Sequence, residues 1–454
     1  MDTNIGSRAA ESPSPQPALF EVPPAPPPGA TAREPSPPRV RQANRTQVLL
    51  RALDLEGMLP EDHRARVVWA YVEGLDLTPL YQEIQAVEGE AGRPATDPKL
   101  LLALWLYATL EGERSARALA RLCAEHLAYQ WLCGDVPMNH HTLSDFRTAH
   151  VEVLDGLLTR SVATLMAQGL VELHRVAQDG VRVRASAGAA SFRRRQTLEG
   201  CLAEAEAQVQ ALRAEVDADP AAASRRQQAA RERAARERAQ RVAQALAHLP
   251  ALEAKKKPAE KPQARVSTTD PEARVMKMPD GGFRPAYNVQ FATDTGSQVI
   301  VGVDATNVGS DQGQLAPMVA QVETRHEHPP GAMLVDGGFA KTEDIEAVSP
   351  RTTVYAPVQT PKDPTRDPHA PRPGDSPAVA AWRARMGTPE AQAIYKERAA
   401  TAECVNAQAR NRGLRQLLVR GLPKVRVIAL WYALAHNLMR AVALGAVVGF
   451  FHSP

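Results

Sequence analysis

The stretch VELHRVAQDGVRVRASA, residues 171–187, alternates apolar and polar side chains with the period of two that is typical of a half-buried strand. The alternation places Ala177, Asp179 and Val181 on one side and Arg182 on the other. An ionised carboxylate on the apolar side of a strand needs a counter-charge or hydrogen bonds to offset its desolvation. Asp179 is therefore the first candidate for a functional residue.

Two more carboxylates occur in suggestive places. The segment GAMLVDGGFA, residues 331–340, predicts a short buried strand that ends at Asp336 before a glycine pair. Open α/β sheets bind ligands beyond the carboxyl ends of their strands. Residues 389–411 have a helical pattern, in which Glu403 shares a face with small side chains and with Arg410. Three acids thus lie on a strand, a strand and a helix, in that order.

This order resembles the DDE transposases of bacterial insertion sequences. In that family the closing Glu lies in a Tyr, Arg, Glu, Lys pattern, and YKERAATAECVNAQAR matches it with Tyr395, Arg398, Glu403 and Arg410. Three more segments resemble the family in the same order along the chain. They are SARALARLCAEHLAYQWLCG with NHHTLSDFR, then DPEARVMKMPDGGFRPAYNVQFATD, then GLPKVRVIALWYALAHNLMR.

The resemblance implies a ribonuclease-H-like catalytic domain with Asp179, Asp336 and Glu403 as catalytic metal ligands. Ligands that offer only oxygen select hard ions, so Mg²⁺ or Mn²⁺ is expected. Two such ions about 3.5–4 Å apart can activate the attacking oxygen and stabilise the leaving one. Water would first free a 3′-hydroxyl at the end of the element, and that hydroxyl would then attack target DNA. A homodimer on two DNA ends is also implied.

The chain departs from the family pattern at three positions. Arg410 stands where Lys is usual, which keeps the charge but changes its shape. Cys404 and Asn406 stand where Pro and an aromatic residue are expected. Two alternatives therefore stay open: a decayed transposase that only binds DNA, and a metal-dependent nuclease without joining activity. Weaker candidates for the acidic ligands are Asp304, Asp311, Glu343 and Glu397.

Two sets of basic residues are candidates for DNA contacts. The resemblance assigns Arg398, Arg410 and Tyr395 to the closing motif, where the arginines would steady phosphates or orient Glu403. A second set lies in an arginine-rich helical stretch and includes Arg231, Arg236 and Arg238. These arginines could neutralise phosphates, or they could pair with acids on the preceding helix.

The chain of 454 residues is long enough for about three domains. Residues 1–45 are rich in Pro, Ala and Ser and predict a disordered tail. Residues 46–170 predict an all-helical domain, either a helix-turn-helix that binds transposon-end DNA or an ordinary bundle. Residues 196–261 predict an inserted helical hairpin with a basic linker. The α/β catalytic domain, a mixed sheet with flanking helices, would comprise residues 171–195 and 262–454.

Charge, cysteine content and apolar runs indicate which partners and which cellular compartment to expect. The net charge of +3 is weak, so contacts with nucleic acid would depend on local basic patches. Four cysteines without C-x-x-C spacing favour neither a zinc site nor a disulfide framework. The apolar run 427–451 is interrupted by His436, Asn437 and Arg440, which favours a core helix over a membrane span. We expect a bacterial cytoplasmic protein associated with the nucleoid, with no signal peptide and no membrane partner.

Overall fold

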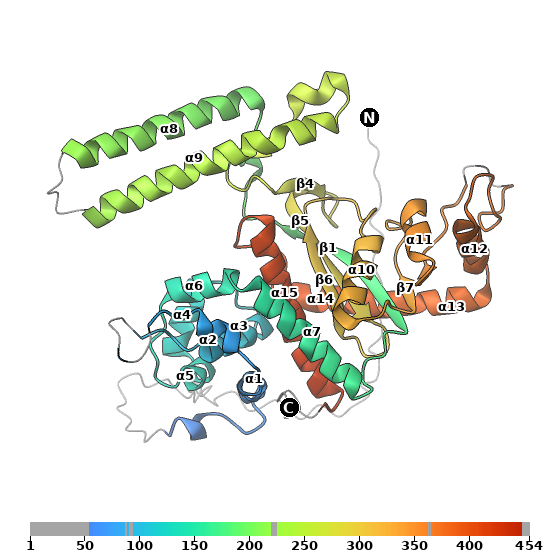
Figure 1. Ribbon diagram of the computed structural model, residues 1–454, viewed down its shortest axis with the longest axis horizontal. Coiled ribbons are helices and arrows are strands. Elements are labelled where there is room, and N and C mark those ends of the chain that lie inside the picture. Colours follow the sequence, from blue (N-terminus) through green and yellow to red (C-terminus); the bar gives the residue numbers. More distant parts are fainter. Residues whose placement is uncertain are drawn as a thin grey trace, which may run out of the picture. The chain divides into compact units, whose positions relative to one another are not determined.

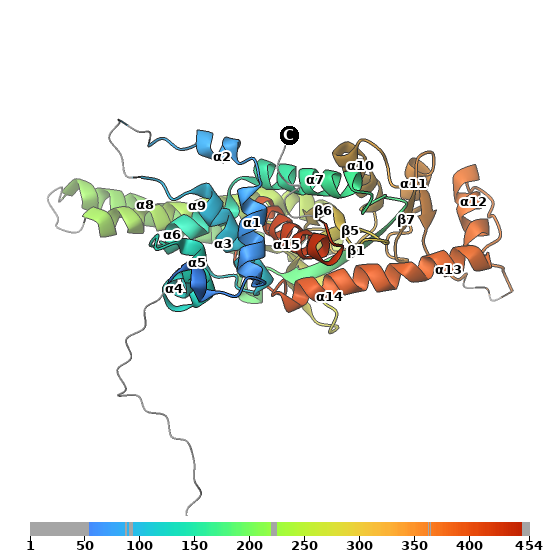
Figure 2. The same cartoon turned by 90° about the horizontal axis from the view of Figure 1, so that it is seen from below.

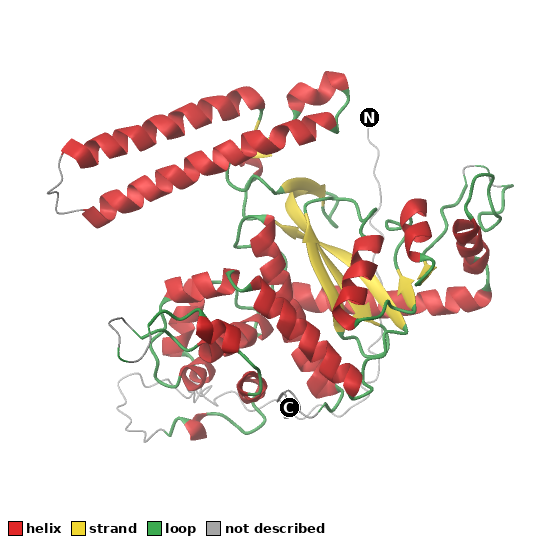
Figure 3. Cartoon of the chain, in the orientation of Figure 1, coloured by secondary structure: helices red, strands yellow, loops and turns green. Residues whose placement is uncertain are grey.

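The structure is a computed structural model that describes residues 54–86, 89, 94–218, 225–361, 363 and 365–446, without the side chains of residues 216–218, 225 and 226. The predicted proline-rich tail, the first residues of the helical segment and the end of the apolar run lie outside the described residues. Most of the described chain is helical, and most strands gather in one sheet (Figure 3). No helix in the described part is long and apolar enough to cross a membrane.

The N-terminal part is helical, as predicted. Its elements are η1 Glu56–Met58, α1 Arg64–Glu73, α2 Thr78–Gln82, α3 Pro98–Leu110, α4 Ala116–Glu125, α5 Leu127–Cys133, α6 His140–Thr148 and α7 Val151–Ala167. Every residue of α3 except Lys99 is buried. The side chains of Asp97, Ser115 and Asn139 accept hydrogen bonds from the first turns of α3, α4 and α6, as N-cap residues do. Gly134, with φ of 53°, ends α5 in the left-handed conformation that glycine favours.

One mixed sheet contains six of the described strands. They are β1 Arg175–Arg184, β4 Arg274–Lys277, β5 Phe283–Asp294, β6 Ile300–Thr306, β7 Ala332–Leu334 and β8 Thr353–Tyr355, paired in the order β4-β5-β1-β7-β8 with β6 also on β5. Strand β1 pairs antiparallel with β5 and parallel with β7. Asp179 faces Phe291 in the β1–β5 register. The central strand therefore places Asp179 between the long hairpin and the parallel strands.

Helices cover both faces of this sheet (Figure 2). They are α10 Leu315–His326, α11 Thr342–Val348, α12 Pro377–Met386, α13 Pro389–Arg398, the π-helical turn η4 Ala399–Glu403 and α14 Cys404–Asn411. On one face of β1, Gln178 donates a hydrogen bond to the backbone just before α10. On the other face, Ala177 packs with Ala402 of η4. Strand β1 is thus enclosed by α10 on one side and by the helix α13–η4–α14 on the other.

The insertion forms the predicted antiparallel hairpin, with α8 Arg195–Ala218 and α9 Arg225–Ala254 side by side (Figure 1). Its apolar seam includes Leu198, Val242 and Leu249. A two-stranded sheet that was not predicted joins the ends of the insertion. In it, β2 Phe192–Arg193 pairs with β3 Val266–Ser267, and the predicted basic linker between α9 and β3 contains the short helix η3 Pro258–Gln263.

The apolar run forms a buried helix, α15 Leu422–Ala443. Its polar residues explain the interruptions of the run. His436 Nε2 donates to the carbonyl of Gln298 at 2.8 Å, and Arg440 Nε donates to the carbonyl of Ser297 at 3.0 Å. Asn437 hydrogen-bonds both the N–H and the C=O of Ile300, at 2.8 and 2.7 Å. These side chains attach α15 to the β5–β6 hairpin, and burial lowers the pKa of His436 to about 4.

Side chains also cover the outer edge of β6. Gln321 on α10 accepts from the N–H of Val303 at 2.8 Å and donates to its C=O at 3.0 Å, as Asn437 does at the start of the same strand. Unpaired backbone groups on an edge strand would otherwise be open to pairing. The same core extends into the N-terminal helices, where the Trp431 indole of α15 donates to the carbonyl of Arg147.

Candidate functional site

Asp179 lies near the middle of β1, and its side chain faces the helix α13–η4–α14. Its Oδ2 accepts a hydrogen bond from Nδ2 of Asn406 at 2.9 Å, and its Oδ1 lies 3.4 Å from Nη2 of Arg398. The side chain is 18% exposed. Burial raises the pKa of this carboxyl group above its ordinary value, and the Arg398 guanidinium opposes that rise. The expectation that Asp179 needs a counter-charge is confirmed.

Asp336 lies two residues beyond the end of β7. Its Oδ1 accepts a hydrogen bond from the N–H of Gly338 at 2.8 Å, and its Oδ2 lies 3.7 Å from Nη2 of Arg398. This is the same nitrogen that contacts Asp179. The parallel pairing of β1 and β7 brings the two acids together, because the strands run side by side in one direction. Two carboxylates from neighbouring strands therefore share one cation.

The helix above these acids is interrupted by the π turn of residues 399–403. In an uninterrupted α-helix, Arg398 and Glu403 would be about 140° apart around the axis. A π turn contains one extra residue, which removes about 100° of that separation and brings the two toward one side. Asn406, on the next turn, is buried and reaches Asp179. Single π turns are frequent at functional sites.

Glu403, at the end of the π turn, stands apart from the two aspartates. Its side chain is exposed and forms no hydrogen bond or ion pair with a described residue. Among the described residues, no three acidic, histidine or cysteine side chains gather closely enough to hold a metal ion. The alternative acid on this helix, Glu397, is engaged elsewhere, with its Oε2 3.1 Å from Nε of Arg175 and hydrogen-bonded to Thr295.

Two family models match this chain. One is described as "Transposase domain (DUF772)" and matches residues 53–149, which include the N-terminal helices. The other is described as "Transposase DDE domain" and matches residues 370–442, from α12 to α15. These two matches support a DDE transposase of an insertion element, and transposase domains indicate a function in transposition.

The matches differ in what they cover. The DDE match contains Arg398 and Glu403 of the transposase, whereas Asp179 and Asp336 lie outside both matches. No curated protein and no solved structure matches the chain. The roles of the two aspartates consequently depend on the geometry described above.

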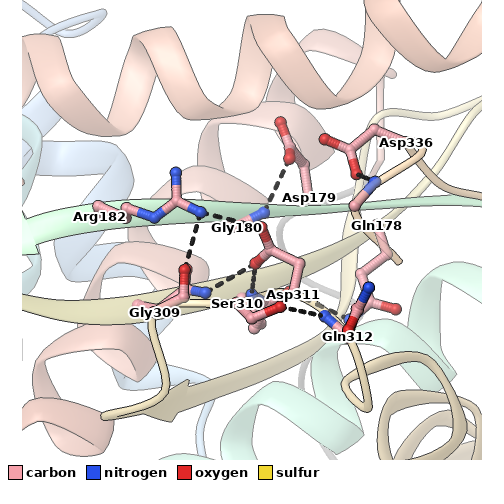
Figure 4. A network of polar contacts seen from close by, with 12 residues as sticks. Gln178, Asp179, Gly180, Arg182, Gly309, Ser310, Asp311, Gln312 and Asp336 are labelled. Atoms are coloured by element: carbon pink, nitrogen blue, oxygen red, sulfur yellow. Dashed lines mark hydrogen bonds and ion pairs between the residues drawn. The ribbon is translucent and has the colours of Figure 1, made fainter. Parts of the chain in front are cut away.

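A half-buried acid, Asp311 in the segment between β6 and α10, lies against the opposite face of β1 (Figure 4). Its Oδ1 accepts hydrogen bonds from Asn288 at 2.7 Å and Gln290 at 2.8 Å, and its Oδ2 lies 3.4 Å from Arg182. A Cβ on Gly180 would lie 2.5 Å from Asp311 Oδ1, so only glycine fits beneath this network. The network fills the space over β1 on the side away from Asp179.

The other weaker candidates have structural partners too. Asp304 Oδ1 lies 2.8 Å from Nε of Arg426, which joins β6 to α15. Glu343 accepts a hydrogen bond from the hydroxyl of Thr342 at 3.3 Å, in the first turn of α11. Neither acid is among the residues that contact Arg398.

The residues predicted to contact DNA have different surroundings in the transposase. Burial raises the pKa of Tyr395, whose hydroxyl lies against Arg398. On α9, Arg236 pairs with Glu232 one turn earlier, and Nη2 of Arg238 lies 3.8 Å from Glu204 across the hairpin. Arg231 is exposed and pairs with no described acid. Arg410 lines a pocket together with Arg182, Arg184, Arg284 and Arg415.

The DDE family implies a divalent metal ion, and the donor set of the transposase fits a hard cation in part. Asp179 and Asp336 offer only oxygen atoms and already share one positive charge. Burial disfavours the ionised form of Asp179, so another cation there would be favourable. Glu403 is the remaining oxygen donor that the resemblance assigns, and it is the one that the structure leaves apart.

Two residues of this site were not predicted in their observed roles. Arg398 was expected to steady phosphates or orient Glu403, yet it bridges Asp179 and Asp336. Asn406 was noted only as a departure from the family pattern, yet it donates directly to Asp179. Its position three residues after Glu403, in place of an aromatic residue, was the available signal.

Proposed function

We propose that this transposase binds the ends of its insertion element, cleaves a phosphodiester by metal-assisted hydrolysis and joins the freed 3′-hydroxyl to target DNA. The observation that carries the proposal is the convergence of Asp179 and Asp336 on one guanidinium beneath the helix that carries Glu403. An antiparallel hairpin followed by parallel strands, with a glutamate on the covering helix, supports a ribonuclease-H-like interpretation of the fold.

In this proposal Asp179, Asp336 and Glu403 hold Mg²⁺ or Mn²⁺. The bound ions would activate the attacking oxygen and stabilise the leaving oxygen of the phosphodiester. Asn406 fixes the orientation of the Asp179 carboxylate through its hydrogen bond. Arg398 keeps the two aspartates close together despite their like charge.

The proposed partners are double-stranded DNA at the terminal inverted repeats and at the target, bound by a homodimer near the bacterial nucleoid. Helix α6 follows α4 and α5 in a helix-turn-helix-like order. It packs through Leu143 and Phe146 and exposes His141, Ser144 and Asp145. An exposed face on the last of three short helices is what entry into a major groove requires.

The test is an assay on a supercoiled plasmid that carries the element with its flanking ends, in Mg²⁺. We expect nicked and joined products from the wild type. Asp179→Asn, Asp336→Asn and Glu403→Gln should each lower product formation by about 10³-fold, because the loss of one preorganised charge-stabilising group commonly has an effect of this size.

Matched substitutions at the rival acids serve as controls. Glu397→Gln lies on the same helix and Asp304→Asn on the same sheet, and both should retain activity because their partners are structural. Cut products without joined ones would indicate a nuclease, and bound but intact DNA would indicate a decayed enzyme. Joining by Asp179→Asn at the wild-type rate would overturn the assignment of the ligands.

A further inference from the structure

An arginine-lined pocket of about 440 Å³ lies at the carboxyl end of β1, where Arg284 of β5 and Arg410 of α14 also line it. The whole chain has a net charge of only +3. In this pocket, five guanidinium groups face a single carboxylate, that of Asp280, among the described lining residues. The arginines are Arg182, Arg184, Arg284, Arg410 and Arg415. Positive charge is therefore concentrated here, and an anion is the kind of ligand that such a pocket attracts.

Rigid elements hold these arginines in place. Arg182 and Arg184 are two residues apart on β1 and so lie on the same side of the strand. Arg284 belongs to β5, where it lies two residues from the partner of Arg184. Arg410 belongs to α14, and the N–H of Arg184 donates to the carbonyl of Arg415 at 3.1 Å. Side chains on strands and helices keep a binding geometry better than side chains on free loops.

Three of the five guanidinium groups have no acidic partner. Arg182 pairs with Asp311 and Arg284 with Asp280, but Arg184, Arg410 and Arg415 form no ion pair with a described residue. Arg415 Nε donates to the carbonyl of Arg410 at 3.0 Å, which keeps both residues at the pocket. Like charges held together without an anion repel one another, and the planar guanidinium fork matches the oxygens of a phosphate.

We infer that this pocket binds the phosphodiester backbone of duplex DNA next to the bond that is cleaved. The inference rests on the proposed function. Arg182 and Arg184 lie three and five residues after Asp179, about 10 and 17 Å along the strand, and on the opposite face of β1. Arg410 is one helical turn beyond Asn406, which contacts Asp179. Arg410 connects the pocket to the helix that contacts Asp179, so a duplex that passes from the candidate site around the end of β1 brings its phosphates to the pocket. Contacts with phosphates position DNA without specifying its sequence.

The test measures how the affinity of the full chain for DNA depends on salt. A fluorescent 30-base-pair duplex of arbitrary sequence is titrated at several NaCl concentrations with wild type, Arg184→Gln, Arg415→Gln and the double variant. Each phosphate contact with duplex DNA contributes about 0.9 to the slope of log K against log salt. We expect the slope to become shallower by about 0.9 in each single variant and by about 1.8 in the double variant.

Arg351→Gln is the matched control, because it removes one exposed arginine at the start of β8, the opposite edge of the sheet from β4. Its slope should equal that of the wild type. Thermal unfolding of every variant should match the wild type, since Arg184 and Arg415 are exposed. An unchanged slope in the double variant would overturn the inference. Absence of nicking by the wild type would instead overturn the proposed function.

Discussion

Asp179 and Asp311 lie on opposite faces of β1, and their partners come from different places. Asp311 receives its hydrogen bonds and its counter-charge from side chains of β1 and β5. Asp179 receives its partners from the covering helix and shares Arg398 with Asp336. A charge compensated by the strands themselves stabilises the sheet. A charge compensated by a shared arginine on another element can exchange that partner for a different cation.

The same substitution at both acids should give the sharpest contrast. Asp311→Asn should lower the free energy of unfolding by about 3 kcal/mol, since it removes the charge that pairs with Arg182 and, while its carbonyl oxygen faces the two amides, turns an NH2 donor toward the guanidinium. Asp179→Asn should not lower the free energy of unfolding, because burial already disfavours its charged form. Urea denaturation at pH 7 measures both values, and equal losses would remove the distinction between the two faces.

The buried His436, which attaches α15 to the β5–β6 hairpin, should make the stability of the fold depend on pH. Its folded pKa of about 4 lies below the ordinary value, so the unfolded chain binds the proton more readily. The stabilisation is fully present above about pH 6.5 and is lost as the pH falls toward 4, by about 3 kcal/mol.

Denaturation at pH 7 and at pH 4 should show this loss in the wild type. His436→Gln keeps an N–H donor for the carbonyl of Gln298 but does not titrate, so its stability should change less over the same range. If His436→Gln lost as much stability between pH 7 and pH 4 as the wild type, His436 would not be the source of the pH dependence.

Arg398 and Arg182 should differ in their response to a metal ion. Arg398→Gln leaves Asp179 and Asp336 without their shared cation and should lower the free energy of unfolding by about 2 kcal/mol in EDTA. Millimolar Mg²⁺ or Mn²⁺ should restore most of this loss, because a ligand that binds only the folded chain stabilises it. Arg182→Gln should show no such recovery. Thermal unfolding of both variants with and without metal measures this difference. Equal stabilisation of Arg398→Gln and Arg182→Gln by metal would contradict the idea that a metal ion can replace Arg398.

Two asparagines that donate to the two acids give the smallest expected effect. Asn406→Ala and Asn288→Ala each remove one hydrogen bond to a carboxylate and should each destabilise the fold by about 1 kcal/mol. Only Asn406→Ala should also slow nicking, by about 10-fold, as is common for residues that orient a metal ligand. The plasmid assay at saturating Mg²⁺ measures the nicking rates of the two variants, and equal rates would contradict a specific role for Asn406.

The periodicity of the sequence predicted much of the fold. Alternation predicted strands within residues 171–187, 287–294 and 298–307, which contain β1, β5 and β6. A short apolar run predicted β7, a further strand was expected at 354–358 near β8, and apolar spacings of three and four predicted the helical hairpin. These elements depend on which side chains face the core, and that information is local. The pair β2–β3 joins residues far apart along the chain, whereas β4 pairs with β5 in a local hairpin. The elements β2, β3, β4 and α12 were not predicted as separate elements.

The candidate site was predicted less completely, for a physical reason. Counting positions on a regular α-helix placed Ala399, Ala400, Asn406, Ala407 and Arg410 around Glu403, but the π turn changes the phase between Arg398 and the residues that follow the turn. The pattern of residues does not reveal that insertion, so the bridge from Arg398 to both aspartates could not be deduced. A helix was predicted to begin near Asn139 or Thr142, and Asn139 caps α6, so His140 and His141 lie in its first turn.

The amides of Gln321 and Asn437 have a consequence for assembly. They occupy backbone donors and acceptors on the free side of β6, so another polypeptide cannot extend the sheet there by strand addition. Two copies that meet on a pair of DNA ends would have to associate at this flank through helix or loop surfaces. The chain's own side chains therefore block strand addition at Ile300 and Val303 of β6.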